Sequence, residues 1–467
     1  MSRNPLAPSW LELPADANAL EPSVWSQNAR RTDEGGIQIA GVAATEIAER
    51  FGTPVYVVDE NDVRSRARHI RDSFEREFAR VGSGVKVYYA GKAFLSTQVA
   101  DWMLSDGLNI DVCSGGELAV ALAAGADPAR LGLHGNNKSV AEIERAVGVG
   151  LGAIVIDSLI EIERVADAAA RAGRVQPVRL RVNSGVHAHT HEYLATARED
   201  QKFGIPLADV TATVRVIRSH ESLRFLGLHS HIGSQIFESD GFAEAARRLF
   251  AVHVELLEGG EVPELNLGGG FGIAYNGADV ALPVDTLAAN LADSVARLAA
   301  EHGVPVPLIA IEPGRSIIGP STTTLYTVGT IKDVLVADTE SPASTRKYVS
   351  VDGGMSDNIR PALYAADYSV RIASRASDAE PQLVRIAGKH CESGDIVVHA
   401  DYLPGDVRAG DLVGVPATGA YGWAMASNYN YLGRPPVVAV RDGAARIIVR
   451  GETEEDLLSR DAGLEQK

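Results

Sequence analysis

Residues 108–161, LNIDVCSGGELAVALAAGADPARLGLHGNNKSVAEIERAVGVGLGAIVIDSLIE, show the repeating pattern from which the fold can be predicted. Three short apolar segments rich in β-branched residues alternate here with longer segments of helical period. The apolar segments are Leu108–Val112, Leu131–His134 and Ala153–Asp157. Such alternation predicts parallel strands that are joined by helices.

The predicted helices begin with capping sequences. Ser114, Ser139 and Ser158 each follow one of these strands, and each is followed three residues later by Glu. In this Ser-x-x-Glu pattern the two side chains bond free backbone N–H groups of the first helical turn. We therefore expect three consecutive strand–helix units in this part of the chain.

The same alternation extends from about residue 55 to residue 320. Five further strands are predicted, at Val85–Ala90, Val178–Val182, Phe225–His229, Glu264–Leu267 and Leu308–Ile311. Eight parallel strands close a (β/α)8, TIM-like barrel, in which the active site lies at the carboxyl ends of the strands. Polar residues and glycines follow most of these strands, so we expect an α/β enzyme.

Beyond residue 320 the pattern changes to short alternating strands separated by Gly, Pro and Asp. The predicted strands include Leu325–Ile331, Lys347–Val351, Leu383–Ala387 and Val437–Val440. This pattern predicts a second, all-β domain of sandwich or barrel type. We expect an N-terminal segment at 1–54 that contributes to this β domain, a barrel at 55–320 and the β domain itself at 321–467.

Composition excludes some classes of partner. The 467 residues carry a formal net charge of -17, which leaves no basic surface for nucleic acid. We find no secretory signal and no apolar run of about 18 residues, so we expect no membrane span and a cytoplasmic location.

The two cysteines, Cys113 and Cys391, cannot form a disulfide framework, and the statistics of free cysteine favour a small buried side chain for each.

Residues after the first, seventh and eighth strands predict a cofactor site. Gly268–Gly270 can bring bare backbone N–H groups to an anion, and Arg315 can add charge-assisted donors at the place where such barrels bind phosphate. Glu312 would repel phosphate, so it should face a cation such as a protonated pyridine nitrogen. Lys92 follows the first strand and can bond an aldehyde. These features together predict pyridoxal 5'-phosphate.

Eight motifs extend this site over nearly the whole chain. They are Tyr89-Ala90-Gly91-Lys92-Ala93, His229-Ser230-His231-Ile232-Gly233-Ser234-Gln235, Gly268-Gly269-Gly270, Glu312-Pro313-Gly314-Arg315, Asp352-Gly353-Gly354-Met355, Arg360-Pro361-Ala362-Leu363-Tyr364, Cys391-Glu392-Ser393-Gly394-Asp395 and Gly419-Ala420-Tyr421-Gly422. With these motifs the chain resembles the alanine-racemase-like pyridoxal-phosphate enzymes, and within them the diaminopimelate decarboxylases. The resemblance implies decarboxylation of meso-2,6-diaminopimelate to L-lysine and carbon dioxide, the last step of lysine biosynthesis.

The resemblance also implies a role for each cofactor residue. Lys92 would form the Schiff base, and His231 would stack on the pyridine ring. Glu312 would pair with the ring nitrogen and keep it protonated, so that the ring accepts electrons from the breaking bond. The remaining cofactor residues, most of them at the phosphate, would be Ser234, Gly269, Gly270, Arg315 and Tyr421.

Substrate binding, proton transfer and assembly follow from the same resemblance. Arginine selects carboxylate and glutamate selects ammonium, and the implied substrate residues are Arg315, Arg360, Tyr364, Glu392 and Tyr421. Cys391 would protonate the product carbanion. The Cys391-Glu392 segment would reach the active site of a neighbouring subunit, which implies a homodimer. The lead Gly388-Lys389-His390 departs from the more apolar, proline-containing lead of many relatives.

Three alternatives remain. The sets His187-x-His189-x-His191 and His229-x-His231 could indicate a metal hydrolase, although Ile-Gly-Ser after His231 suits ring stacking and phosphate better, and we expect no metal. A non-catalytic pyridoxal-phosphate-binding protein would consist of the barrel alone. An amino-acid racemase would use a tyrosine base in a different motif from the Cys-Glu-Ser-Gly-Asp sequence.

Overall fold

The computed structural model describes residues 4–186, 202–338 and 341–464. The chain divides into two compact units. One unit contains Arg64–Gly272 and Ala281–Ser316, and we call it the barrel unit; the other contains Met1–Val63, Ile273–Val280 and Ile317–Lys467, and we call it the β unit. Within the described residues, no helix is both long and apolar enough to cross a membrane.

The barrel unit is a closed ring of eight parallel strands. They are β5 (Val85–Ala90), β6 (Asn109–Val112), β7 (Leu131–Leu133), β8 (Ala153–Ile156), β9 (Gln176–Asn183), β11 (Leu223–His229), β12 (Glu264–Asn266) and β13 (Leu308–Ile311). Pairing of β13 with β5 and of β8 with β9 closes the ring. The predicted α/β barrel is therefore confirmed, and every predicted strand overlaps one of these eight. A short ninth strand, β10 (Ile205–Pro206), pairs with the end of β9.

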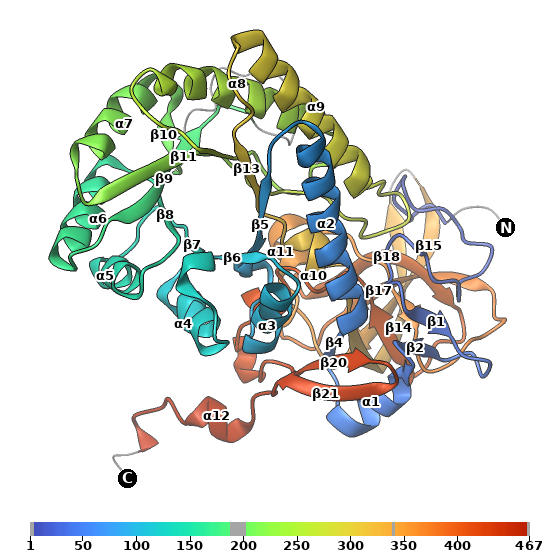
Figure 1. Ribbon diagram of the computed structural model, residues 1–467. Helices are drawn as coiled ribbons and strands as arrows, with labels where there is room; N and C mark the ends of the chain where they lie inside the picture. The colour runs from blue at the N-terminus through green and yellow to red at the C-terminus, as the bar shows by residue number, and fades with distance from the viewer. Residues whose placement is uncertain (1–3, 187–201, 339–340, 465–467) are drawn as a thin grey trace. The chain divides into compact units, whose positions relative to one another are not determined.

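Helices surround the ring of strands (Figure 1). They are α3 (Thr97–Ser105), α4 (Gly115–Ala123), α5 (Val140–Val149), α6 (Leu159–Arg171), α7 (Val210–Ser219), α8 (Asp240–Leu257) and α9 (Val284–His302). Two more helices, α2 (Glu60–Arg80) and α10 (Arg315–Ile318), contain two of the four points where the chain passes between the units. Their amphipathic sequences explain the arrangement, since buried residues recur on one face of each helix.

The three predicted capping boxes have different outcomes. Ser139 and Glu142 form a complete box at the start of α5. Ser114 accepts a bond from the N–H of Glu117, but the Glu117 carboxylate bonds the N–H of Cys113 instead of that of Ser114.

The third box is wrong, because the Ser158 side chain makes no capping bond. Glu161 instead accepts a bond from the N–H of Asp157 and pairs with the buried Lys138 at 3.0 Å. A buried ammonium group needs an anionic partner, and this requirement draws Glu161 away from the helix terminus.

The β unit is built on a nine-stranded sheet. Its strands are β4 (Val55–Asp59), β14 (Thr322–Asp338), β15 (Ser341–Val351), β16 (Arg371–Ile372), β17 (Pro381–Ala387), β18 (Ile396–Pro404), β19 (Leu412–Val415), β20 (Val437–Arg441) and β21 (Ala444–Val449). The main path is β18-β17-β15-β14-β4-β20-β21, with β19 paired to β14 and β16. The four strands predicted beyond residue 320 all lie within this set. Three helices complete the unit, α1 (Ala44–Phe51), α11 (Arg360–Tyr364) and α12 (Glu454–Leu458).

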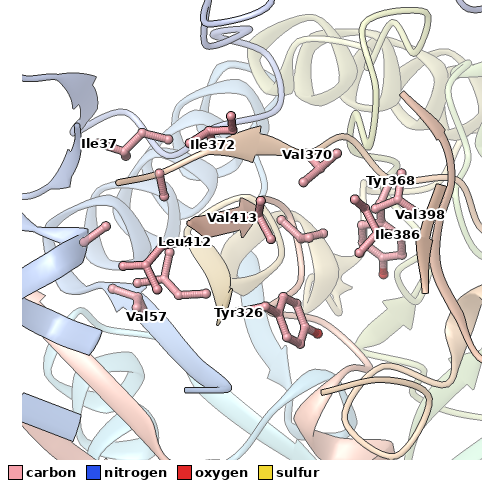
Figure 2. Close-up of a cluster of buried hydrophobic side chains, with 14 of the residues drawn as sticks. Ile37, Val57, Tyr326, Tyr368, Val370, Ile372, Ile386, Val398, Leu412 and Val413 are labelled. Carbon is pink, nitrogen blue, oxygen red and sulfur yellow. The ribbon is translucent and has the colours of Figure 1, made fainter. Parts of the chain in front are cut away.

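Two segments distant in sequence complete the core of the β unit. The N-terminal strands β1 (Ala29–Arg31), β2 (Ile37–Ile39) and β3 (Val42–Ala43) form a small sheet of their own. Ile37 of this sheet belongs to the same buried cluster as Val57 of β4 and Leu412 of β19, as Figure 2 shows. Tyr275, from the short insertion at 273–280, packs edge-on against Tyr368 in this cluster.

Candidate active site

A cavity of about 520 Å³ lies at the carboxyl ends of the barrel strands. Its walls come from the ends of four strands, β5, β6, β9 and β11, and from loops that follow strands of the barrel, including β7 and β13. The lining residues are Ala90, Lys92, Asp111, Cys113, His134, Gly135, Asn136, Arg181, Phe203, His229, His231, Ile232, Gly233 and Glu312. Three residues of the predicted cofactor site, Lys92, His231 and Glu312, therefore share one cavity.

Lys92 lies in a short 3-10 turn directly after β5. The buried Tyr89 hydroxyl donates to the Phe94 carbonyl at 2.6 Å and fixes this turn. A Cβ at Gly91 would lie 2.9 Å from the Asp111 carbonyl, so a larger residue would displace the turn. Lys92 is exposed to the cavity while both neighbours are buried, which is the placement that a lysine needs to bond a cofactor.

Glu312 is a buried carboxylate in the cavity wall, with an exposed fraction of 9%. Its Oε1 accepts a hydrogen bond from Asn266 Nδ2 at 2.7 Å and lies 3.1 Å from His229 Nε2. Burial by itself opposes ionisation, but His229 and His134 hold the pKa of Glu312 well below its usual range. Burial lowers the pKa of His229 to about 4, so at neutral pH the neutral imidazole donates to the Glu312 anion.

Asp111 stands beside this anion in the opposite charge state. Burial and the negative charge of Glu312 raise the pKa of Asp111 well above its usual range. Neither Asp111 carboxyl oxygen has a hydrogen-bond partner among the described residues, although His134 Nε2 lies 3.2 Å from Oδ1. Two carboxyl groups that share a low-dielectric site do not both ionise, so the pair carries one negative charge, on Glu312.

The loops after β11, β12 and β13 approach one another through glycine. Gly270 has φ +113°, and a Cβ there would lie 2.3 Å from the Gly233 carbonyl. A Cβ at Gly269 would lie 2.1 Å from the Glu312 carbonyl. Arg315 Nη2 donates to Ser234 Oγ at 2.7 Å, so the phosphate residues predicted from three separate loops converge.

His231 presents a neutral ring to the cavity. Its Nδ1 accepts the Gly269 N–H at 3.3 Å, which leaves the ring proton on Nε2. Burial and the positive charge of Lys92 lower the pKa of His231 to about 3. An uncharged, fixed aromatic ring is suited to stacking on a flat cofactor.

The arrangement fits pyridoxal phosphate. The cavity offers an accessible lysine at one wall and, at another, a buried anion that a protonated pyridine nitrogen would complement. The glycine loops with Ser234 and Arg315 offer backbone and guanidinium donors suited to phosphate.

A metal ion is the alternative to pyridoxal phosphate at this site. His134, His229 and Glu312 form a cluster whose possible ligand atoms lie within 4.8 Å of one another. His231 does not belong to this cluster, and His187, His189 and His191 lie outside the described residues.

Five predicted site residues lie in the β unit, namely Arg360, Tyr364, Cys391, Glu392 and Tyr421. Arg360 is 5% exposed, its guanidinium lies 4.6 Å from the Tyr275 ring centroid, and its Nη1 donates to the Tyr368 hydroxyl. Tyr364 is 61% exposed, and the Cys391 and Glu392 side chains are also exposed. Tyr421 adopts a left-handed backbone conformation, with φ +61°.

Several residues of the site, or their contacts, could not be predicted from the sequence. Asp111, His134 and Asn266 were visible as polar residues at strand ends, but their partners depend on distances that no sequence spacing gives. Arg181, which lies 4.1 Å over the Phe203 ring, gave no signal. The expectation of a buried side chain is wrong for both cysteines, because Cys113 is exposed to the cavity by the turn after β6 and Cys391 lies at an exposed loop tip. Desolvation of the thiol by the surrounding cavity wall, together with the negative charge of Glu117, raises the pKa of Cys113 to about 12.

Comparison with known proteins shows to which class of enzymes this chain belongs. A family model described as the pyridoxal binding domain of pyridoxal-dependent decarboxylases matches residues 61–319. The protein is therefore a pyridoxal-phosphate-dependent carboxy-lyase. The matched region contains all the lining residues of the cavity.

Whole-chain relatives identify the family more closely. Diaminopimelate decarboxylase of Mycobacterium tuberculosis is 50% identical over 448 residues, which are 94% of this chain and 98% of that protein. The enzyme of Mycobacterium leprae is 50% identical over 466 residues, 98% of this chain and 96% of the relative. A crystal structure of diaminopimelate decarboxylase from M. jannaschii in co-complex with L-lysine has a TM-score of 0.86 at 31% identity, covering 93% of this chain and 98% of that one. The chain belongs to the diaminopimelate decarboxylase family.

Proposed function

We propose that this protein decarboxylates meso-2,6-diaminopimelate to L-lysine and carbon dioxide with pyridoxal phosphate, as the last step of lysine biosynthesis. The observation that carries the proposal is the buried, ionised Glu312 in a cavity that also exposes Lys92. When bound, the cofactor supplies an electron sink for the bonding pair left by carbon dioxide. The whole-chain likeness to diaminopimelate decarboxylases supports the choice of substrate.

The barrel residues would hold and tune the cofactor. Lys92 would bind it covalently, and Arg315 and Ser234, with the N–H groups of Gly269 and Gly270, would hold the phosphate. His231 would cover one face of the ring. Glu312 would keep the ring nitrogen protonated, because its own pKa stays low among the neutral donors His229 and Asn266.

The β-unit residues would select the substrate and supply a proton. The buried Arg360 guanidinium is restrained by the rings of Tyr275 and Tyr368, and its Nε has no hydrogen-bond partner among the described residues. A restrained guanidinium is suited to a distal carboxylate. Tyr364 and Tyr421 would contact the same substrate, and Glu392 would bind its ammonium group. Cys391 would transfer its thiol proton to the carbon that lost the carboxyl group.

One assay tests the reaction and the substrate together. We would measure carbon dioxide release from meso-diaminopimelate, L-ornithine, L-arginine and L-lysine, with and without added pyridoxal phosphate. Cofactor-dependent release from diaminopimelate alone is the expected result. Preference for ornithine or arginine would overturn the assignment of diaminopimelate as the substrate. Absence of carbon dioxide release from all four amino acids would favour a cofactor-binding protein without turnover.

The proposal includes a homodimer whose active sites combine Lys92 of one subunit with Cys391 of the other. The exposed Cys391-Glu392 segment and the 61% exposed Tyr364 support it. Lys92→Ala and Cys391→Ala proteins, unfolded and refolded together, should regain about a quarter of wild-type activity, because half of the dimers then contain one intact site. Sites built within one chain would regain none. We also propose a cytoplasmic location, which cell fractionation would test.

A further inference from the structure

The loop that carries Cys391 is exposed at its tip and buried at its two ends. Residues 391–394 are exposed, whereas His390 and Asp395 are 8% and 3% exposed. The Asp395 carboxylate accepts the N–H of His390 at 2.7 Å and the N–H of Met355 at 2.6 Å. Asp395 therefore ties the loop ends to the segment around Met355, but it makes no contact of this kind with Cys391 itself.

The imidazole of His390 provides a second anchor. Its Nε2 lies 3.3 Å from the Ser356 N–H and 2.9 Å from Ser356 Oγ. A backbone N–H can only donate, so Nε2 is the acceptor and Nδ1 carries the ring proton. Nδ1 then donates to Asn430 Oδ1 at 3.2 Å. The ring also stacks on Tyr429, with centroids 5.3 Å apart.

The same Asn430 oxygen holds the backbone of Cys391. The Cys391 N–H donates to Asn430 Oδ1 at 3.3 Å, so one oxygen accepts from His390 and from the next residue along the chain. Asn430 itself has φ +52°, a conformation that asparagine tolerates better than most residues. The imidazole thus fixes the amide orientation that places an oxygen, rather than an NH2 group, against Cys391.

We infer that His390 is a positioning residue for Cys391, acting through Asn430. This inference rests on the proposed role of Cys391 as the proton donor. Both ring nitrogens of His390 are occupied by Ser356 and Asn430, so the imidazole itself is not the acid. An apolar or proline residue at 390 could not make this bond to Asn430, so positioning through an imidazole is specific to sequences with histidine at this place.

The test is a double-mutant cycle with holoenzyme. His390→Leu, Cys391→Ala and the double variant would be compared with wild type for kcat, KM and bound cofactor. We expect His390→Leu to lower kcat by roughly 10- to 100-fold, which is the effect of misplacing a reacting group, here the Cys391 thiol. KM and the amount of bound cofactor should not change. In the Cys391→Ala background the same change should lower kcat less than about threefold, because the group that it positions is gone.

Two further variants separate positioning from folding. In His390→Asn the side-chain NH2 can take the place of Nδ1–H, so this variant should recover most of the lost kcat. His399→Leu, in β18 of the same unit, is the matched control and should lower kcat equally with and without Cys391. An additive cycle, or an asparagine variant as poor as the leucine variant, would overturn the inference. If Cys391→Ala alone keeps wild-type kcat, the proposed proton donor fails instead.

Discussion

Replacing Glu312 with glutamine isolates one negative charge in the candidate active site. The substitution keeps the shape of the side chain, and the structure can accommodate it. Asn266 can still donate to the remaining oxygen. His229 Nδ1 has no hydrogen-bond partner among the described residues, so its proton can move to Nδ1 while Nε2 accepts from the new NH2 group. We therefore expect the variant to fold.

The catalytic cost follows from the charge that is lost. Two unit charges about 4 Å apart interact by about 4 kcal/mol at an effective dielectric constant of about 20, which suits buried protein sites as well as exposed ones, and a glutamine dipole retains part of this interaction. A loss of roughly 2–3 kcal/mol corresponds to a decrease in kcat of about 30- to 150-fold. Carbon dioxide release from meso-diaminopimelate measures it, with the exposed Glu163→Gln on α6 as control. A kcat within threefold of wild type, in a protein with normal cofactor content, would refute the role of Glu312.

Three further changes have distinct expected results. Lys92→Ala should abolish both turnover and the absorbance band of the lysine-bound cofactor, and a variant that keeps both would exclude Lys92 as the attachment point. Cys391→Ala should lower kcat far more than cofactor affinity; equal losses in the two measurements would indicate a structural cysteine. Asp357→Asn should change the pH dependence of stability, because burial raises the pKa of this carboxyl to about 7. This carboxyl ionises at a lower pH in the unfolded chain than in the folded one, so the free energy of unfolding of the wild type should fall by roughly 3 kcal/mol between pH 4 and pH 7. Urea unfolding should show no such fall for the variant. Parallel curves of unfolding free energy against pH for the two proteins would contradict this explanation.

The barrel and the cofactor residues could be predicted because their signals are local in sequence. Strand period, helical period and polar strand ends mark each β/α unit, and the barrel brings all strand ends to one face. Lys92, His231 and Glu312 therefore line one cavity, as their positions after different strands predict. The substrate and proton-donor residues came from resemblance alone, and for these the predictions above remain the test.

Other features depend on distances between segments remote in sequence. The insertion at 273–280 belongs to the β unit although it lies between barrel elements. Glu161 leaves its expected capping position because a buried Lys138 requires an anion. The same pattern of serine and glutamate gives a complete box at Ser139, half of one at Ser114 and no serine cap at Ser158, so nothing local distinguishes the three outcomes.

The fold class, the eight strands of the barrel and the residue types at the cofactor site follow from the amino-acid sequence, because periodicity and glycine requirements act over a few residues. Only the tertiary structure decided which groups carry charge and which are held in place. Asp111 and Glu312 are remote in sequence, yet they share one negative charge, since burial raises the cost of a second. Likewise His390, Ser356 and Asn430 meet only when three loops fold together. Such interactions depend on distance and burial, which are properties of the folded chain.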